Sequence, residues 1–130
     1  MINLGKRAVA CKGWRWMPGM RTADAMRVIH DPDRWPDRPC ASREGGWVDT
    51  APPRPLKDDL PDLCDPATMG CLLALVRRAW SDECAHMMPQ SMSGGGGWDF
   101  WACPPGDGNC PRGVGQTEAE ALVAALEGAP

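Results

Sequence analysis

The amino-acid sequence predicts an α+β fold, in which a small antiparallel β-sheet is layered between helices. Two segments, 65–80 and 117–127, repeat apolar residues with the spacing of one helical face and begin with helix-capping residues. Short segments of alternating or aromatic residues lie around the first of them, separated by turns rich in Gly and Pro, as is typical of antiparallel strands. A chain of 130 residues fits one core, so we expect a single domain over 1–130.

The N-terminal part contains one helix candidate and two strand candidates. Residues 1–13 are expected to form a short helix with its apolar side chains on one side. Residues 14–17 alternate apolar and polar side chains up to Pro18-Gly19, a turn dipeptide. A second strand is expected at 25–30, where alternate side chains share one face.

An irregular segment is expected from about 31 to 61, because Pro, Asp, Arg and Gly dominate it. Within it, residues 46–48 are a candidate for a short strand. The prolines of 52–55 favour an extended polyproline conformation and disfavour both a helix and a central strand. This stretch fits a surface loop, and the alternative is a docking motif for a partner groove lined with aromatic side chains.

The segment 65–80 carries the strongest helix pattern. Asp65 is placed as the N-cap and Pro66 as the first helical residue, where its missing N–H is harmless. The apolar residues at the spacing of one helical face are Met69, Leu72, Leu73, Val76 and Trp80. Cys71 and Leu75 widen this stripe, so we expect the helix to lie at the centre of the core.

Two further strands are expected after this helix. The first is 84–92, which an internal proline restricts to an edge or a bulge. The glycine run at 93–97 fits a hairpin connection to an aromatic strand at 98–102. In this strand Asp99 and Trp101 point to one face, while the residues between and beside them point to the other.

The end of the chain is expected to form a loop and then a helix. Residues 104–115 are rich in Gly and Pro and predict the loop. Thr117 as N-cap and Glu120 as the third helical residue form a capping box. The apolar residues on one face are Ala119, Leu122, Val123 and Leu126. We expect this helix to cover the sheet and to end at Gly128.

The charge of the chain excludes some classes of partner. The formal net charge is −3, from 14 basic and 17 acidic residues, and no basic stripe is present. This pattern argues against binding to a nucleic-acid backbone. No apolar run reaches the length of a membrane span or of a signal peptide, so we expect an intracellular protein without a membrane partner.

Seven Cys and two His are candidate metal ligands, but their spacing does not support a site. Structural zinc sites use Cys pairs about two to four residues apart, and here the one close pair is Cys84 with His86. We therefore expect no metal or other cofactor, and free thiols in a reducing compartment. The alternative is a disulfide between Cys103 and Cys110, which bracket a loop of Pro and Gly.

No catalytic arrangement stands out. Nothing pairs His30 or His86 with a nucleophile and an orienting group. The Asp residues within 58–65 precede a helix, whose dipole favours negative charge at that position. The glycine run lacks the Lys-Ser/Thr and the following helix of a phosphate-binding loop. We therefore expect no enzymatic activity.

Binding remains as the functional hypothesis. Trp and Arg side chains gather in the irregular segment, and this composition is found in interface hot spots and in base-stacking sites. The candidate partner- or ligand-binding residues are Arg34, Trp35, Arg38, Arg43 and Trp47. The alternative is that the two Trp side chains fold back and fasten the segment to the sheet.

Three stretches of the chain resemble a known family. They are GWRWMPGM at 13–20, LPDL at 60–63 with DPATMGCLL at 65–73, and TEAEALVAALE at 117–127. Together they are similar to the small prophage and bacteriophage proteins of the phage ABA sandwich domain family. The resemblance implies an α/β/α sandwich and a phage origin, but no activity and no functional residues.

The resemblance and the lack of a catalytic pattern lead to two functional hypotheses. The first is a non-enzymatic phage accessory protein that binds a host protein in the host cytoplasm during infection, for instance to inhibit an antiviral defence system. The alternative is a small-molecule sponge that sequesters a nucleotide-like immune signal between Trp and Arg side chains.

Overall fold

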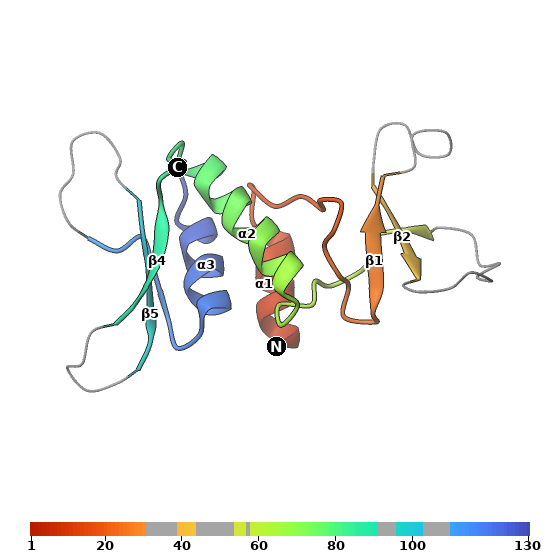
Figure 1. Cartoon of the computed structure of the whole chain (residues 1–130), viewed down its shortest axis with the longest axis horizontal. Coiled ribbons are helices and arrows are strands. Elements are labelled where there is room, and N and C mark those ends of the chain that lie inside the picture. Colours follow the sequence, from red (N-terminus) through yellow and green to blue (C-terminus); the bar gives the residue numbers. More distant parts are fainter. Residues whose placement is uncertain (31–38, 44–53, 57, 91–95, 103–109) are drawn as a thin grey trace.

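In the part of the chain that the structure describes, three helices lie at the centre and a small sheet lies at each end (Figure 1). The computed structural model describes residues 1–30, 39–43, 54–56, 58–90, 96–102 and 110–130. The helices are α1 (Ile2–Ala10), α2 (Pro66–Ala79) and α3 (Glu118–Glu127). The first sheet is ordered β1 (Met26–Ile29), β2 (Cys40–Arg43) and β3 (Arg54–Pro55). The second sheet is ordered β4 (His86–Pro89), β5 (Trp98–Trp101) and β6 (Gly113–Gly115).

The α+β class is confirmed, and all strand pairs are antiparallel. The layering differs from the expected single sheet between helices. The strands form two three-stranded sheets, and the helices lie between them (Figure 1). The reason lies in α2, which contacts a separate apolar cluster on each of two sides.

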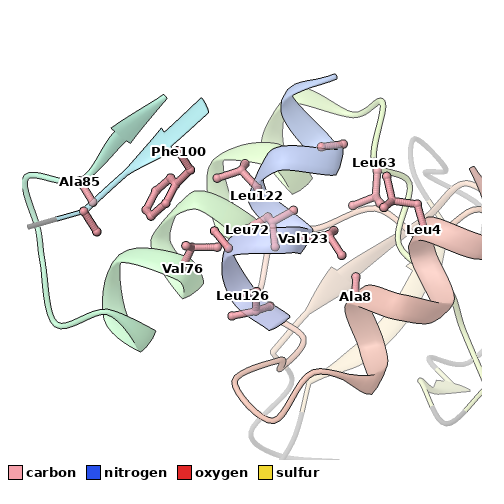
Figure 2. Close-up of a cluster of buried hydrophobic side chains, with 13 residues drawn as sticks. Leu4, Ala8, Leu63, Leu72, Val76, Ala85, Phe100, Leu122, Val123 and Leu126 are labelled. Carbon is pink, nitrogen blue, oxygen red and sulfur yellow. The ribbon is translucent and has the colours of Figure 1, made fainter. Parts of the chain in front are cut away.

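The larger cluster, which we call the main core, joins the three helices to the second sheet (Figure 2). Its buried residues are Leu4, Ala8, Leu63, Leu72, Val76, Ala85, Phe100, Ala102, Ala119, Leu122, Val123, Ala125 and Leu126. From α2, Leu72 and Val76 enter it with no exposed surface, and Phe100 of β5 is equally buried. The stripe predicted for 65–80 therefore faces the main core.

The smaller cluster, which we call the side core, joins α2 to the first sheet. Its buried residues are Met20, Val28, Ala41, Leu56 and Leu75. The partly buried Cys71 packs against it as well. Leu75 and Cys71 are the two residues that widen the apolar stripe in the sequence, so the width of that stripe reflects packing on two sides of the helix.

Both predicted helix starts are confirmed. The Asp65 side chain accepts a hydrogen bond from the Thr68 N–H at 2.8 Å. At the start of α3, the Glu120 N–H donates to the Thr117 hydroxyl at 3.2 Å. The Glu120 carboxylate accepts in return from the Thr117 N–H at 3.3 Å, which completes the capping box.

Helix α3 covers one face of the second sheet, as expected, and packs directly on the backbone of β6. A Cβ atom at Gly113 would lie 2.6 Å from the Ala125 nitrogen, and one at Gly115 would lie 2.6 Å from the Ala121 nitrogen. The prediction of a loop over 104–115 is wrong for this strand. Two Gly in three residues indicate a loop in sequence, but here they permit the close approach of a helix.

The strand predicted at 14–17 is wrong. These residues lie in no strand, and the backbone N–H of Trp14 donates to the Cys11 carbonyl at 2.9 Å. The rings of Trp14 and Trp16 meet edge to face with centroids 5.5 Å apart, and both pack against the side core. The turn that follows is confirmed, with Gly19 at a φ of +97°.

The other strand predictions have different outcomes. Strands β1 and β5 fall inside their predicted ranges, and β4 lies at a sheet edge as its proline requires. Strand β2 was not predicted, because it lies in the segment expected to be irregular. Strand β3 contains Pro55 and also lies at an edge. The strand candidate at 46–48 lies outside the described residues.

Candidate functional site

The candidate binding residues chosen from the sequence lie almost entirely outside the described residues. This applies to Arg34, Trp35, Arg38 and Trp47. The backbone of Arg43 belongs to β2 and pairs with Met26, while its side chain is not described. The described residues offer three other places where side chains gather: one face of the second sheet, a groove at the helix ends, and a polar network.

The second sheet turns one face away from α3. Its register aligns Met88, Asp99 and Val114 in one row across the three strands, and His86 with Trp101 in the next. Side chains alternate between the faces of a sheet. The residues of these two rows therefore lie opposite the face that α3 covers. We call this surface the outer face and define it as His86, Met88, Asp99, Trp101 and Val114.

The outer face carries large apolar side chains in contact with solvent. Met88 is 47% exposed and Val114 is 51% exposed. The other strongly exposed large apolar residues in the described ranges are Met1 and Ile2, at the start of the chain. Trp101 is half-buried and lies opposite His86 in the neighbouring row. Met and Trp are enriched in protein interfaces, and exposed apolar groups that gather on one face mark interaction surfaces.

Asp99 is the acidic residue of the outer face, and it lies at the middle of the row that crosses all three strands. Its carboxylate accepts a hydrogen bond from the Gln90 side-chain amide at 2.8 Å. Within the described part of the chain it forms no ion pair. The row therefore places a half-buried negative charge between two exposed apolar side chains. The alternation of residues 98–102 already put Asp99 and Trp101 on one face, so the sequence did contain a signal for this surface.

The free edge of β4 is a poor template for an added strand. The backbone N–H of Gln90 donates to the Gly97 carbonyl at 2.8 Å. Because backbone hydrogen bonding alternates along an antiparallel pair, the backbone groups of Met87 and Pro89 point toward the free edge. Pro89 has no N–H to donate. Pro89 therefore limits the backbone hydrogen bonds that this edge of β4 could offer to an added strand.

A groove of about 530 Å³ lies where the C-terminal ends of the three helices meet. The Arg7 guanidinium bridges α1 and α3 across it, with hydrogen bonds of 2.8 and 2.7 Å to the Glu127 carboxylate. The hydrogen bond from Arg7 holds the pKa of Glu127 below its usual value. Burial raises the pKa of the Cys11 thiol, which also lines the groove. Cys11 is therefore a protonated thiol at neutral pH and a weak nucleophile.

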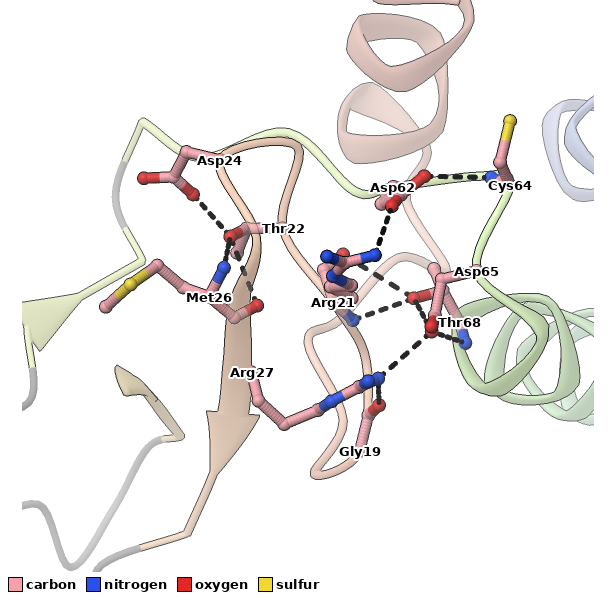
Figure 3. A network of polar contacts seen from close by, with 10 residues as sticks. All are labelled: Gly19, Arg21, Thr22, Asp24, Met26, Arg27, Asp62, Cys64, Asp65 and Thr68. Atoms are coloured by element: carbon pink, nitrogen blue, oxygen red, sulfur yellow. Dashed lines mark hydrogen bonds and ion pairs between the residues drawn. The ribbon is translucent and has the colours of Figure 1, made fainter. Parts of the chain in front are cut away.

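A polar network joins the first sheet to the start of α2 (Figure 3). The Arg27 guanidinium lies 3.0 Å from the Asp65 carboxylate and donates to the Gly19 carbonyl at 2.7 Å. The Thr68 hydroxyl donates to the same carboxylate at 2.9 Å and accepts from the Arg21 N–H at 2.7 Å. Asp65 thus serves as the helix cap and as the ion-pair partner of Arg27. This member of the acidic run before α2 therefore has a structural role.

The same contacts set the charge state of Asp65. Burial by itself raises the pKa of Asp65. The hydrogen bonds from the Thr68 N–H and hydroxyl and from Arg27 outweigh burial, and they hold this pKa below its usual value. The ionised carboxylate is therefore the form that the fold stabilises.

Replacing Asp65 with Asn should make the free energy of unfolding depend less on pH in the acidic range. Because the folded pKa of Asp65 is lowered, its contribution is complete above the unfolded value of about 3.9 and is lost as the pH falls through the folded value. We expect Asp65→Asn to lower the free energy of unfolding by about 1–2 kcal/mol at pH 7. Urea unfolding at pH 7 and below pH 4 measures this difference, which should shrink on acidification. The exposed Asp58, replaced by Asn, is the control, and a difference that stayed constant with pH would contradict the assignment.

Trp and Arg do meet once in the described ranges, but as an internal contact. The Arg112 guanidinium lies 5.3 Å from the centre of the Trp80 ring, and the Trp80 indole N–H donates to the Ala125 carbonyl at 2.9 Å. These contacts join the end of α2 to α3 and to the residue before β6. The arrangement is an intramolecular cation–π pair.

The described residues contain no group of three or more His, Cys, Asp or Glu side chains that could hold a metal ion. His86 contacts the Cys84 carbonyl at 3.3 Å through its Nδ1 atom. No helix in the same ranges is long and apolar enough to cross a membrane. Comparison with protein-family models, curated proteins and solved structures gave no match to this chain.

Proposed function

We propose that this chain is a non-enzymatic phage accessory protein that binds a host protein in the host cytoplasm and inhibits it, with the outer face as its binding surface. The observation that supports the binding surface is the exposure of Met88 and Val114 on a sheet face that no described helix covers. The resemblance of three sequence stretches to phage ABA sandwich proteins supports the phage origin. A host antiviral defence protein is the class of partner that we favour.

The composition of the outer face suits a protein partner. Burial of Met88, Trp101 and Val114 against apolar groups would supply the driving force for association. A sheet face presents rows of side chains rather than an enclosing cavity, whereas a small molecule needs a concave site that encloses most of its surface. This contrast favours a protein partner over the nucleotide sponge at this face.

Capture from a host-cell lysate tests the proposal. Tagged wild-type protein should retain a host protein, and Met88→Lys with Val114→Lys should reduce the retained amount at least tenfold. Ile2→Lys is the matched control, because Ile2 is an exposed apolar residue outside the second sheet. Both variants should keep the wild-type melting temperature, since the altered side chains are solvent-exposed.

Two results would contradict the proposal. One is equal capture by the outer-face variant and the wild type. The other is saturable calorimetric binding of a cyclic nucleotide by the wild type, with no protein retained from the lysate. The second result would support the sponge, whose candidate residues Arg34, Trp35, Arg38, Arg43 and Trp47 could then be replaced in turn.

A further inference from the structure

We infer that the partner bound by the outer face presents a Lys or Arg side chain that pairs with Asp99 inside a ring of apolar contacts. This inference rests on the proposed function and names the chemistry of the partner. Asp99 lies at the middle of the three-strand row of the outer face, between Met88 of β4 and Val114 of β6. A protein that covers the two apolar side chains also covers the carboxylate.

Covering Asp99 without a cation would oppose binding. The Asp99 Oδ1 atom accepts from the Gln90 amide, and no hydrogen bond to Oδ2 occurs within the described residues. A carboxylate removed from water is strongly destabilised unless charged or hydrogen-bonding groups replace its hydration. The Gln90 amide is neutral and satisfies one of the two oxygens. The partner therefore supplies the positive charge.

The same charge argues against other occupants. In a face-to-face contact between two copies, each outer face would bring its own Asp99 and no Lys or Arg, because its five residues include neither. Nucleic acid and anionic lipid both present phosphates, which Asp99 would repel. A host protein with a basic residue among apolar neighbours has the complementary charge.

The test is a charge exchange between the two proteins. The host protein retained in the capture experiment is produced in pure form, and its affinity for each variant is measured by calorimetry. Asp99→Lys should weaken binding about 30-fold or more, and Asp99→Asn less. Changing the contacting Lys or Arg of the partner to Glu should raise the affinity of the partner for Asp99→Lys at least tenfold. Glu83→Lys, at an exposed position outside the outer face, makes the same change in net charge and should bind as the wild type.

The outcomes separate this inference from the function on which it rests. If Met88→Lys abolishes binding while Asp99→Lys binds as tightly as the wild type, the outer face is a binding surface but the inference is wrong. Failure of every partner Lys or Arg replacement to rescue Asp99→Lys also overturns it. Self-association of the wild type in sedimentation, weakened by Met88→Lys, would instead identify a second copy as the occupant. If the wild type retains no host protein through this face, the proposed function fails first.

Discussion

Gly113→Ala is expected to lower the free energy of unfolding by about 3 kcal/mol, because the new methyl group overlaps the backbone of α3. A Cβ atom at this position would lie 2.6 Å from the Ala125 nitrogen and 2.7 Å from the Ala125 Cβ, and it would also meet the Ala121 carbonyl oxygen. These are helix backbone or Cβ atoms, so no side-chain rotation relieves the overlap. The helix must move away from β6, which loosens contacts of Leu122 and Val123 in the main core. Urea unfolding followed by circular dichroism measures the loss.

Gly70→Ala is the matched control for this change. Gly70 lies in α2, and a Cβ atom there would meet nothing within 4 Å beyond its chain neighbours and the backbone of its own helix. Ala is favoured over Gly inside a helix by roughly 0.5–1 kcal/mol, so this variant should be slightly more stable than the wild type. The same substitution is thus expected to have opposite signs at two positions. Equal stability of Gly113→Ala and the wild type would show that α3 does not pack directly on β6.

Leu72→Ala is expected to destabilise the protein by roughly 2–5 kcal/mol. Leu72 is 0% exposed and lies where α2 meets α3 and the second sheet (Figure 2). Removing its side chain deletes apolar contacts and leaves a cavity that the surrounding helices cannot fully close. Thermal and urea unfolding should both show the loss, at unchanged helix content in the native baseline.

Leu73→Ala provides the comparison within the same helix. Leu73 is partly buried and packs at the margin of the main core. Solvent can fill the space it leaves, so its truncation should cost less than that of Leu72. If the two variants were equally destabilised, α2 would not direct Leu72 into the main core and leave Leu73 at its margin.

The helices could be predicted from the sequence because their signals are local. Asp65 followed by Pro66, and Thr117 followed three residues later by Glu120, satisfy the first N–H groups of each helix from nearby side chains. The apolar spacing of 65–80 then places the helix against a core. None of these signals requires knowledge of a distant segment.

The two sheets could not be predicted to the same extent, because their strands depend on distant partners. Strand β6 contains Gly113 and Gly115, which have no side chain and so allow α3 to pack on the strand. Their role depends on α3 and is not visible in the local sequence. The alternation of 14–17 predicts a strand, yet it arises from two indoles that pack against the side core without a pairing strand. Local pattern and long-range packing are separate sources of information at these positions.

The candidate site was predicted only in part. The alternation of 98–102 put Asp99 and Trp101 on one face, but their row neighbours Met88 and Val114 come from other strands. Register decides which residues meet across a sheet, and it is set by hairpin geometry and by the helix that covers the opposite face. The Trp and Arg composition of the irregular segment predicts binding residues that lie outside the described ranges, apart from the backbone of Arg43.

The position of α2 between two cores has a consequence for how the molecule responds to change. Its residues Leu72 and Leu75 belong to different clusters, yet they are neighbours on a single rigid helix. We expect a disturbance of the side core to shift or fray the same helix that closes the main core. The two sheets, which lie at opposite ends of the molecule (Figure 1), should then be thermodynamically linked, so that an event at one end changes the stability of the other.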